Sequence, residues 1–234
     1  MIEGIDIGLE GGGFYSLVGP SGCGKTSLLL LLAGLVSPTA GEVRLGGECA
    51  DDARRNHRIG FVFQRSPFFE WLSVLENVAL PARLLRLTDP ESRAIEILDE
   101  FELAEFASLR PAQLSAGMLA RAALARALIN RPAYLFLDEA LGSLDEPLRD
   151  VISDKLQQVW IDYAPTVVSV THNLDEAALF SDGVIALSSR PARIAHSVKV
   201  QLPRPRTGSM RSELAHQNAV AELRSTFRLL GDRR

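Results

Sequence analysis

The stretch FYSLVGPSGCGKTS, residues 14–27, decides the fold of this chain. It begins with a short apolar run of the kind that forms a buried strand, and it continues into a glycine-rich turn that ends in Lys25 and Thr26. The turn matches the pattern G-x-x-x-x-G-K-[ST], in which consecutive backbone amides and the start of the next helix face an anion. A strand, a glycine loop and a helix in this order predict a phosphate-binding site.

The side chains of this loop suit a nucleoside triphosphate. We expect Lys25 to reach the β- and γ-phosphates, the Thr26 hydroxyl to ligate Mg²⁺, and Ser27 to touch the α-phosphate. The predicted nucleotide-binding residues of the loop are Gly19, Pro20, Ser21, Gly22, Cys23, Gly24, Lys25, Thr26 and Ser27. A glycine-rich turn without a ligand is the alternative, and the flanking strand and helix favour the phosphate site.

Apolar runs alternate with helical patterns along the rest of the chain. We expect strands at 14–18, 59–63, 134–137, 166–170 and 184–187. We expect helices at 25–33, 91–101, 119–129, 147–160 and 175–180. The alternation predicts an α/β fold with a mostly parallel sheet. Residues 66–111 contain no convincing strand and are expected to form a helical insertion, whereas the segment after Arg190 is expected to be extended and to end in a helix near 211–230.

Composition narrows the class of protein. A chain of 234 residues with 47% hydrophobic content can bury one sizeable core. Ten of its 25 Lys and Arg residues, but only three of its 29 Asp and Glu residues, lie from Arg190 onward. A single aromatic residue, Phe227, lies among these arginines, too few for a series of stacking platforms, so we expect a solvated basic tail and not a nucleic-acid arm.

Targeting and redox signals are weak. The two cysteines are too few for a disulfide scaffold and fit a reducing compartment. The apolar run 28–36 is about half the length that a membrane-spanning helix needs, and no signal peptide is recognised at the N-terminus. We therefore expect any action on a membrane to take place at its surface.

Polar side chains follow several of the predicted strands. Asp138 and Glu139 come directly after the apolar strand 134–137, at the edge where ligands collect in a parallel sheet. Asp138 is suited to the Mg²⁺ hydration shell, and Glu139 to accepting a proton from an attacking water. His172 and Gln64 follow two further strands. Surface charge and a structural histidine are the alternatives, and each residue alone is weak evidence.

Six segments, in this order along the chain, resemble the motifs of the nucleotide-binding subunit of an ABC transporter. They are GPSGCGKT (Walker A), Gln64 in FVFQ (Q-loop), LSAGM at 114–118 (signature), YLFLDE at 134–139 (Walker B), SLD at 143–145 (D-loop) and His172 in SVTHN (switch histidine). The resemblance covers about residues 11–206. It implies an ABC ATPase of the P-loop NTPase fold with a small antiparallel β portion. The implied parts are a catalytic core at 1–65 and 112–190, a helical subdomain at 66–111 and a basic C-terminal extension at 191–234.

The family resemblance also implies partners and roles. Two such subunits pack head to tail around ATP, so Ser115, Gly117 and Asp145 are expected to complete the nucleotide site of a second copy. Glu139, His172 and Gln64 are the implied catalytic residues. The implied ligands of Mg²⁺ are Thr26, Gln64 and Asp138. The region 67–81 is expected to contact transmembrane permease subunits at the cytoplasmic face of a bacterial inner membrane, with an extracytoplasmic solute-binding protein as an indirect partner and no nucleic acid.

Softer features resemble the nitrate/sulfonate/taurine importer subfamily. They are Met118, the segment WLSVLENVALP and the tail SSRPARI…LPRPR. The sequence also departs from the family at Ala116, Ala140 and Asn173, and an aromatic residue placed upstream to stack on adenine is not found. Two alternatives stay open: a degenerate, non-hydrolysing partner subunit, and a soluble ABC ATPase that does not serve transport.

Overall fold

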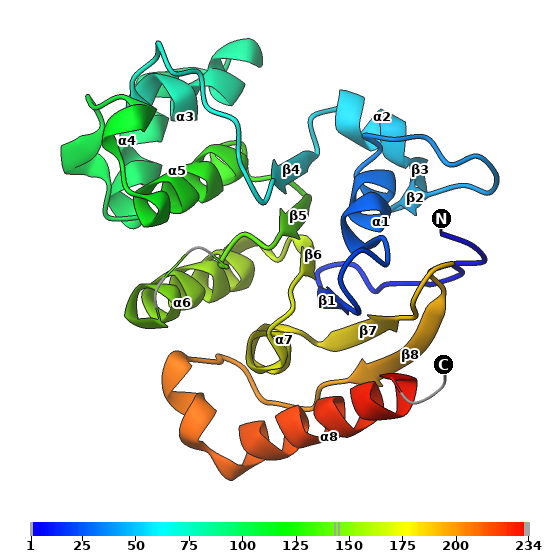
Figure 1. The fold of residues 1–234 in the computed structure, drawn as a ribbon. Coiled ribbons are helices and arrows are strands. Elements are labelled where there is room, and N and C mark those ends of the chain that lie inside the picture. The colour runs from blue at the N-terminus through cyan, green and yellow to red at the C-terminus, as the bar shows by residue number, and fades with distance from the viewer. Residues whose placement is uncertain (1, 143, 145, 232–234) are drawn as a thin grey trace.

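The computed structural model describes residues 2–142, 144 and 146–231. Its main sheet has the strand order β4-β5-β6-β1-β7-β8 (Figure 1). These strands are β1 (Phe14–Val18), β4 (Ile59–Val62), β5 (Tyr134–Asp138), β6 (Thr166–Val170), β7 (Gly183–Leu187) and β8 (Ile194–Lys199). All neighbouring pairs are parallel except β7 and β8. The predicted mostly parallel sheet and its five expected strands are confirmed, and β8 is a strand where only extended chain was expected.

Helices lie between the parallel strands and after the last strand, as the sequence pattern predicts, although none was expected at 50–55. They are α1 (Lys25–Leu32), α2 (Ala50–Arg55), α3 (Val74–Leu84), α4 (Pro90–Glu100), α5 (Ala116–Leu128), α6 (Glu146–Tyr163), α7 (Leu174–Phe180) and α8 (Leu214–Gly231). Three single turns of 3₁₀ helix span Ala104–Phe106, Pro111–Gln113 and Gly208–Ser212. The small antiparallel portion is the hairpin of β2 (Arg44–Leu45) and β3 (Glu48–Cys49).

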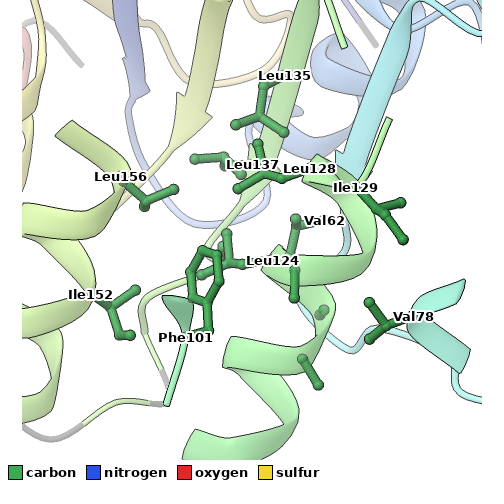
Figure 2. Packing of buried hydrophobic residues seen from close by; sticks show 14 of the residues in the cluster. Val62, Val78, Phe101, Leu124, Leu128, Ile129, Leu135, Leu137, Ile152 and Leu156 are labelled. Atoms are coloured by element: carbon green, nitrogen blue, oxygen red, sulfur yellow. The ribbon is translucent and has the colours of Figure 1, made fainter. Parts of the chain in front are cut away.

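Alternate residues of β5, an interior strand of the sheet, enter different parts of the core. Leu135 and Leu137 join a cluster with the helices α5 and α6, whereas Phe136 joins a second cluster with α1. This strand is buried along its whole length, which explains why its sequence is apolar without alternation. Figure 2 shows side chains of the first cluster, among them Leu137 of β5, Leu124 of α5 and Ile152 of α6.

Residues 66–111 form no strand, as expected. The helices α3 and α4 pack against each other and against α5, and the three lie together at one end of the molecule (Figure 1). The start of α3 is fixed by a reciprocal cap, because the Ser73 hydroxyl accepts from the Glu76 amide and the Glu76 carboxylate accepts from the Ser73 amide. The proposed division into core, helical subdomain and extension stays a prediction.

The expectation of a solvated basic tail is wrong for the segment that follows β8. Arg206 is 2% exposed and donates to the Ser181 carbonyl at 2.7 Å. Arg204 donates to the Asp182 carboxylate at 2.8 Å and lies 3.9 Å above the ring of Trp160. A buried guanidinium needs such partners, because leaving water is costly for a charge. These arginines therefore anchor the chain below the end of α7, and α8 then packs on α7.

Within the described residues, every helix is too short or too polar to cross a bilayer. The run 28–36 lies partly in α1, whose Leu28 and Leu29 are core residues, as the length of the run predicts. Both cysteines are free thiols; Cys23 is buried and Cys49 is exposed.

Candidate functional site

The phosphate loop lies between β1 and α1. Gly22 and Gly24 have φ angles of 73° and 120°, which side-chain-bearing residues rarely adopt, so the curl of the loop depends on glycine here. The Lys25 ammonium is buried beneath the loop and donates to the carbonyls of Gly19 at 2.9 Å and Pro20 at 3.0 Å. The predicted lysine is thus held at the N-terminus of α1, where the helix dipole favours an anion.

Two oxygen ligands predicted for Mg²⁺ lie side by side. The Thr26 hydroxyl donates to the Asp138 carboxylate at 3.0 Å, although 112 residues separate them in sequence. Burial raises the pKa of the Asp138 carboxyl, and the Thr26 hydrogen bond opposes that shift. A hydroxyl and a carboxylate at the start of a phosphate-binding helix form the hard oxygen set that Mg²⁺ prefers, so the residues present fit this ion.

The three predicted catalytic side chains converge on one oxygen. Gln64 Nε2 donates to Glu139 Oε2 at 3.0 Å, and His172 Nδ1 lies 3.8 Å from the same oxygen. Each residue follows a different strand of the parallel sheet, so the sheet brings three loops together at its carboxyl edge. Glu139 itself has a φ angle of 48°, a strained conformation for this residue type, of the kind that clusters at active sites.

Sequence reasoning missed the polar residues around these loops. Arg149 on α6 and Glu176 on α7 form an ion pair with Nε and Oε1 3.3 Å apart, and both side chains are mostly buried. Charged residues on helices usually mark a solvated face, so their sequence gave no signal of burial. The one available signal is position, since each lies in a helix that begins just after a predicted functional loop.

The signature segment is placed differently from the phosphate loop. The Ser115 hydroxyl accepts from the Met118 amide at 3.3 Å and thereby caps α5. Ser115 and Ala116 are exposed, and Gly117 is half-buried. Among the described residues, no hydrogen bond or ion pair joins these three to the phosphate loop. Asp145 and Ser143 of the predicted D-loop lie outside the described residues.

A groove of about 940 Å³ runs beside the phosphate loop, between the N-terminal residues 2–9, α1 and the hairpin. Its aromatic side chains, Tyr134 and Phe136, are 8% and 1% exposed within the sheet. Phe14 is buried in the core, as expected. The expectation that adenine finds no stacking aromatic from upstream of the loop stays a prediction.

The comparisons with known proteins assign the family. Residues 2–142 match the family model described as ABC transporter. The chain belongs to the ABC transporter family. Over 206 residues this ABC chain is 41% identical to the aliphatic sulfonates import ATP-binding protein SsuB 3 of Pseudomonas savastanoi pv. phaseolicola, covering 88% of the chain and 73% of that relative.

A second relative is much longer than this ABC chain. The bicarbonate transport ATP-binding protein CmpC of Synechococcus elongatus is 40% identical over 229 residues, which are 96% of the chain but only 34% of CmpC. The resemblance to the importer subfamily of nitrate and sulfonate therefore agrees with the relatives found.

Solved structures agree with the fold. The dimeric post-hydrolysis state of the ATP-binding cassette MJ0796, bound to ADP and Pi, superposes with a TM-score of 0.79 at 31% identity, covering 86% of this ABC chain and 91% of that one. A second dimeric structure of MJ0796, described as a bacterial ABC transporter cassette, gives 0.78 at 32% identity. The predicted P-loop NTPase fold of the ABC type is confirmed.

Proposed function

We propose that this chain hydrolyses ATP as one half of a dimeric cassette that powers a bacterial importer. One observation supports the proposal above the others: Gln64 and His172 converge on Glu139, directly after the Asp138 that bonds Thr26. A carboxylate beside a predicted Mg²⁺ site is the arrangement that activates a water for attack on a terminal phosphate.

Each loop has a defined part in this reaction. The backbone amides of the phosphate loop and the Lys25 ammonium would bind the β- and γ-phosphates. Thr26 and Asp138, together with Gln64, would hold Mg²⁺, which when bound neutralises phosphate charge. Glu139 would take a proton from the attacking water through Oε2, and His172 would orient the reacting groups from the same side.

The signature residues would act on a second copy of the chain. Ser115, Gly117 and the N-terminus of α5 present a capped helix end toward solvent, which suits a phosphate brought by a partner. Together with Asp145 they would complete the partner's nucleotide site. ATP would then bind the closed dimer more tightly than the open monomer, and hydrolysis would let the dimer open.

The test is the solution mass of the Glu139→Gln variant with and without MgATP, beside ATP hydrolysis by the unmodified chain. Glutamine keeps the shape of the side chain but cannot accept the proton, so we expect a stable MgATP-dependent dimer and hydrolysis reduced by about a hundredfold or more. Glu96→Gln, on the exposed face of α4, is the matched control and is expected to hydrolyse normally. An unmodified chain that binds ATP without hydrolysing it would support the degenerate partner subunit instead.

For the membrane partner, we propose the surface at 67–81. Trp71 is 69% exposed and its ring lies 5.1 Å from that of Phe69, which makes an aromatic pair on a surface loop. The buried Asn77 holds this loop, because its amide donates to the carbonyls of Phe69 and Ser73 and its oxygen accepts from the Phe69 amide. A permease subunit would dock here at the cytoplasmic face of the inner membrane, and a solute-binding protein would act only through that permease.

Co-purification with the importer's membrane subunits tests this surface. Trp71→Ala is expected to weaken assembly while leaving ATP hydrolysis by the isolated chain within about twofold. Leu84→Ala, equally exposed at the end of α3 but outside the region, is the control. Full assembly of the Trp71 variant would refute the site. The relatives suggest a small anion such as bicarbonate or a sulfonate as the transported solute.

A further inference from the structure

A buried ion pair lies beside the catalytic loops and belongs to none of the six motifs. Arg149 Nε and Glu176 Oε1 are 3.3 Å apart, with side chains 20% and 10% exposed. One residue is on α6 and the other on α7, the two helices that begin after the Glu139 turn and after the His172 loop. Moving two charged side chains out of water costs free energy, so the presence of this ion pair calls for a physical reason.

Arg149 binds the turn that follows Glu139. Its guanidinium donates to the carbonyl of Leu144 at 2.6 Å and to that of Leu141 at 3.4 Å. The same turn is closed by the Gly142 amide, which donates to the Glu139 carbonyl at 3.0 Å. Arg149 therefore fixes the backbone that leaves the catalytic carboxylate.

Glu176 binds the loop that carries His172. Its Oε2 accepts from the Thr171 hydroxyl at 2.9 Å, and the Thr171 oxygen in turn accepts from the Asn173 amide at 3.0 Å. Both neighbours of His172 are thus bonded, while the histidine itself is 71% exposed and touches only the Glu139 carboxylate at 3.8 Å among the described contacts. The loop, and not packing of the ring, sets where this side chain lies.

We propose that Arg149 and Glu176 are positioning residues for ATP hydrolysis, a proposal that rests on the function proposed above. Their ion pair joins the turn after Glu139 to the loop around His172 and so fixes the distance between the two catalytic side chains. A cavity of about 50 Å³ lies between the pair and those side chains, so the pair acts through backbone and not by touching the reacting groups. A displacement of about 1 Å in such a site can cost a hundredfold in rate.

Steady-state hydrolysis by Arg149→Gln and Glu176→Gln tests the proposal. Glutamine at 176 keeps an oxygen for Thr171 and removes only the charge, so this variant carries the test if Arg149→Gln fails to fold. We expect kcat to fall about tenfold in each folded variant, with the KM for MgATP within about twofold, because the nucleotide contacts are intact. An unchanged kcat in Glu176→Gln would overturn the proposal.

A double-mutant cycle that combines Glu176→Gln with His172→Ala separates positioning from general destabilisation. If the pair acts through His172, Glu176→Gln lowers kcat little further in the His172→Ala background, because residues that act as one unit are not additive. A full tenfold further loss in that background would overturn the proposal.

Asp150→Asn is the matched control. Asp150 is the next residue of α6 and pairs with Arg211 at 3.1 Å, away from the catalytic loops. We expect its kcat to equal that of the unmodified chain, and an equal loss in this variant would also overturn the proposal. An unmodified chain without any hydrolysis would refute the proposed function itself, whereas hydrolysis that survives in the pair variants refutes only the positioning role.

Discussion

Two helices of this molecule begin with glycine and serine or threonine residues, and they differ in how much of a site each one forms. At the start of α1, Lys25 is buried beneath its own loop and Thr26 is bonded to Asp138 from a distant strand. At the start of α5, Ser115 caps its own helix and Ala116 faces solvent. One helix start is enclosed by the chain, and the other is open.

The difference shows which of the two helix starts a single chain can enclose with its own residues. Residues that follow strands of the sheet close around the start of α1, because the loops after parallel strands meet at one edge. Among the described residues, no hydrogen bond or ion pair joins a residue that follows a strand to Ser115, Ala116 or Gly117. The start of α5 is stabilised by its own cap, so a nucleotide bound there would have to be brought by a second copy of the chain, as proposed above.

The largest effect is expected at the enclosed site. Lys25→Ala removes the ammonium from the phosphate loop, so we expect hydrolysis to fall by about a thousandfold and nucleotide binding to weaken. Steady-state ATPase assays and titration with a fluorescent nucleotide measure both. Lys199→Ala, on the exposed face of β8, is the control. Normal hydrolysis by the Lys25 variant would place the phosphates elsewhere.

A smaller effect is expected at the open site. Ser115→Asp preserves the cap of α5, since aspartate is an equally good N-cap, but it directs a negative charge at the partner's phosphate. We expect MgATP-dependent dimerisation to weaken on the order of tenfold to a hundredfold, with thermal stability unchanged. Ser115→Asn supplies a neutral cap of similar size for comparison. Equal dimerisation of the two variants would argue that α5 does not face a nucleotide.

The smallest effect is expected at Ala116. Replacing it with glycine removes one methyl beside the open site and restores a smaller residue at the first position of α5. We expect hydrolysis to stay within about twofold and the free energy of unfolding to fall by at most about 1 kcal/mol. A chemical denaturation curve measures the second quantity. A tenfold rise in hydrolysis would mean that the methyl group obstructs the partner's nucleotide.

Much of the enclosed site could be predicted from sequence because its signals are local. Lys25 and Thr26 lie in one short pattern, and Asp138 and Glu139 follow directly after an apolar strand. The order of the strands was not in these patterns, but any parallel sheet brings such loops to one edge. The convergence of Gln64 and His172 on Glu139 also requires β4 and β6 to lie on either side of β5, and this order was not predicted.

The buried charges could not be predicted in the same way. Segments from other parts of the chain bury Arg149, Glu176 and Arg206. From the sequence alone, a charged residue is expected at the surface, because the segments that cover it are not yet known. The expectation of a solvated tail fails at Arg204 and Arg206 for this reason, because their charge can be counted from the sequence but their partners cannot. The number of charged residues in a segment therefore does not predict whether each of their side chains is exposed.

The left-handed backbone at Glu139 affects which substitutions a copy of this chain would accept without selection for hydrolysis. Holding a glutamate at a φ angle of 48° costs about 1 kcal/mol or more, and Glu102 has a similar angle of 55° outside the catalytic loops. In a duplicated copy relieved of hydrolysis, mutation to glycine at this position would make folding easier, so drift would favour it. Glycine is therefore the residue expected at this position in a copy that no longer hydrolyses ATP.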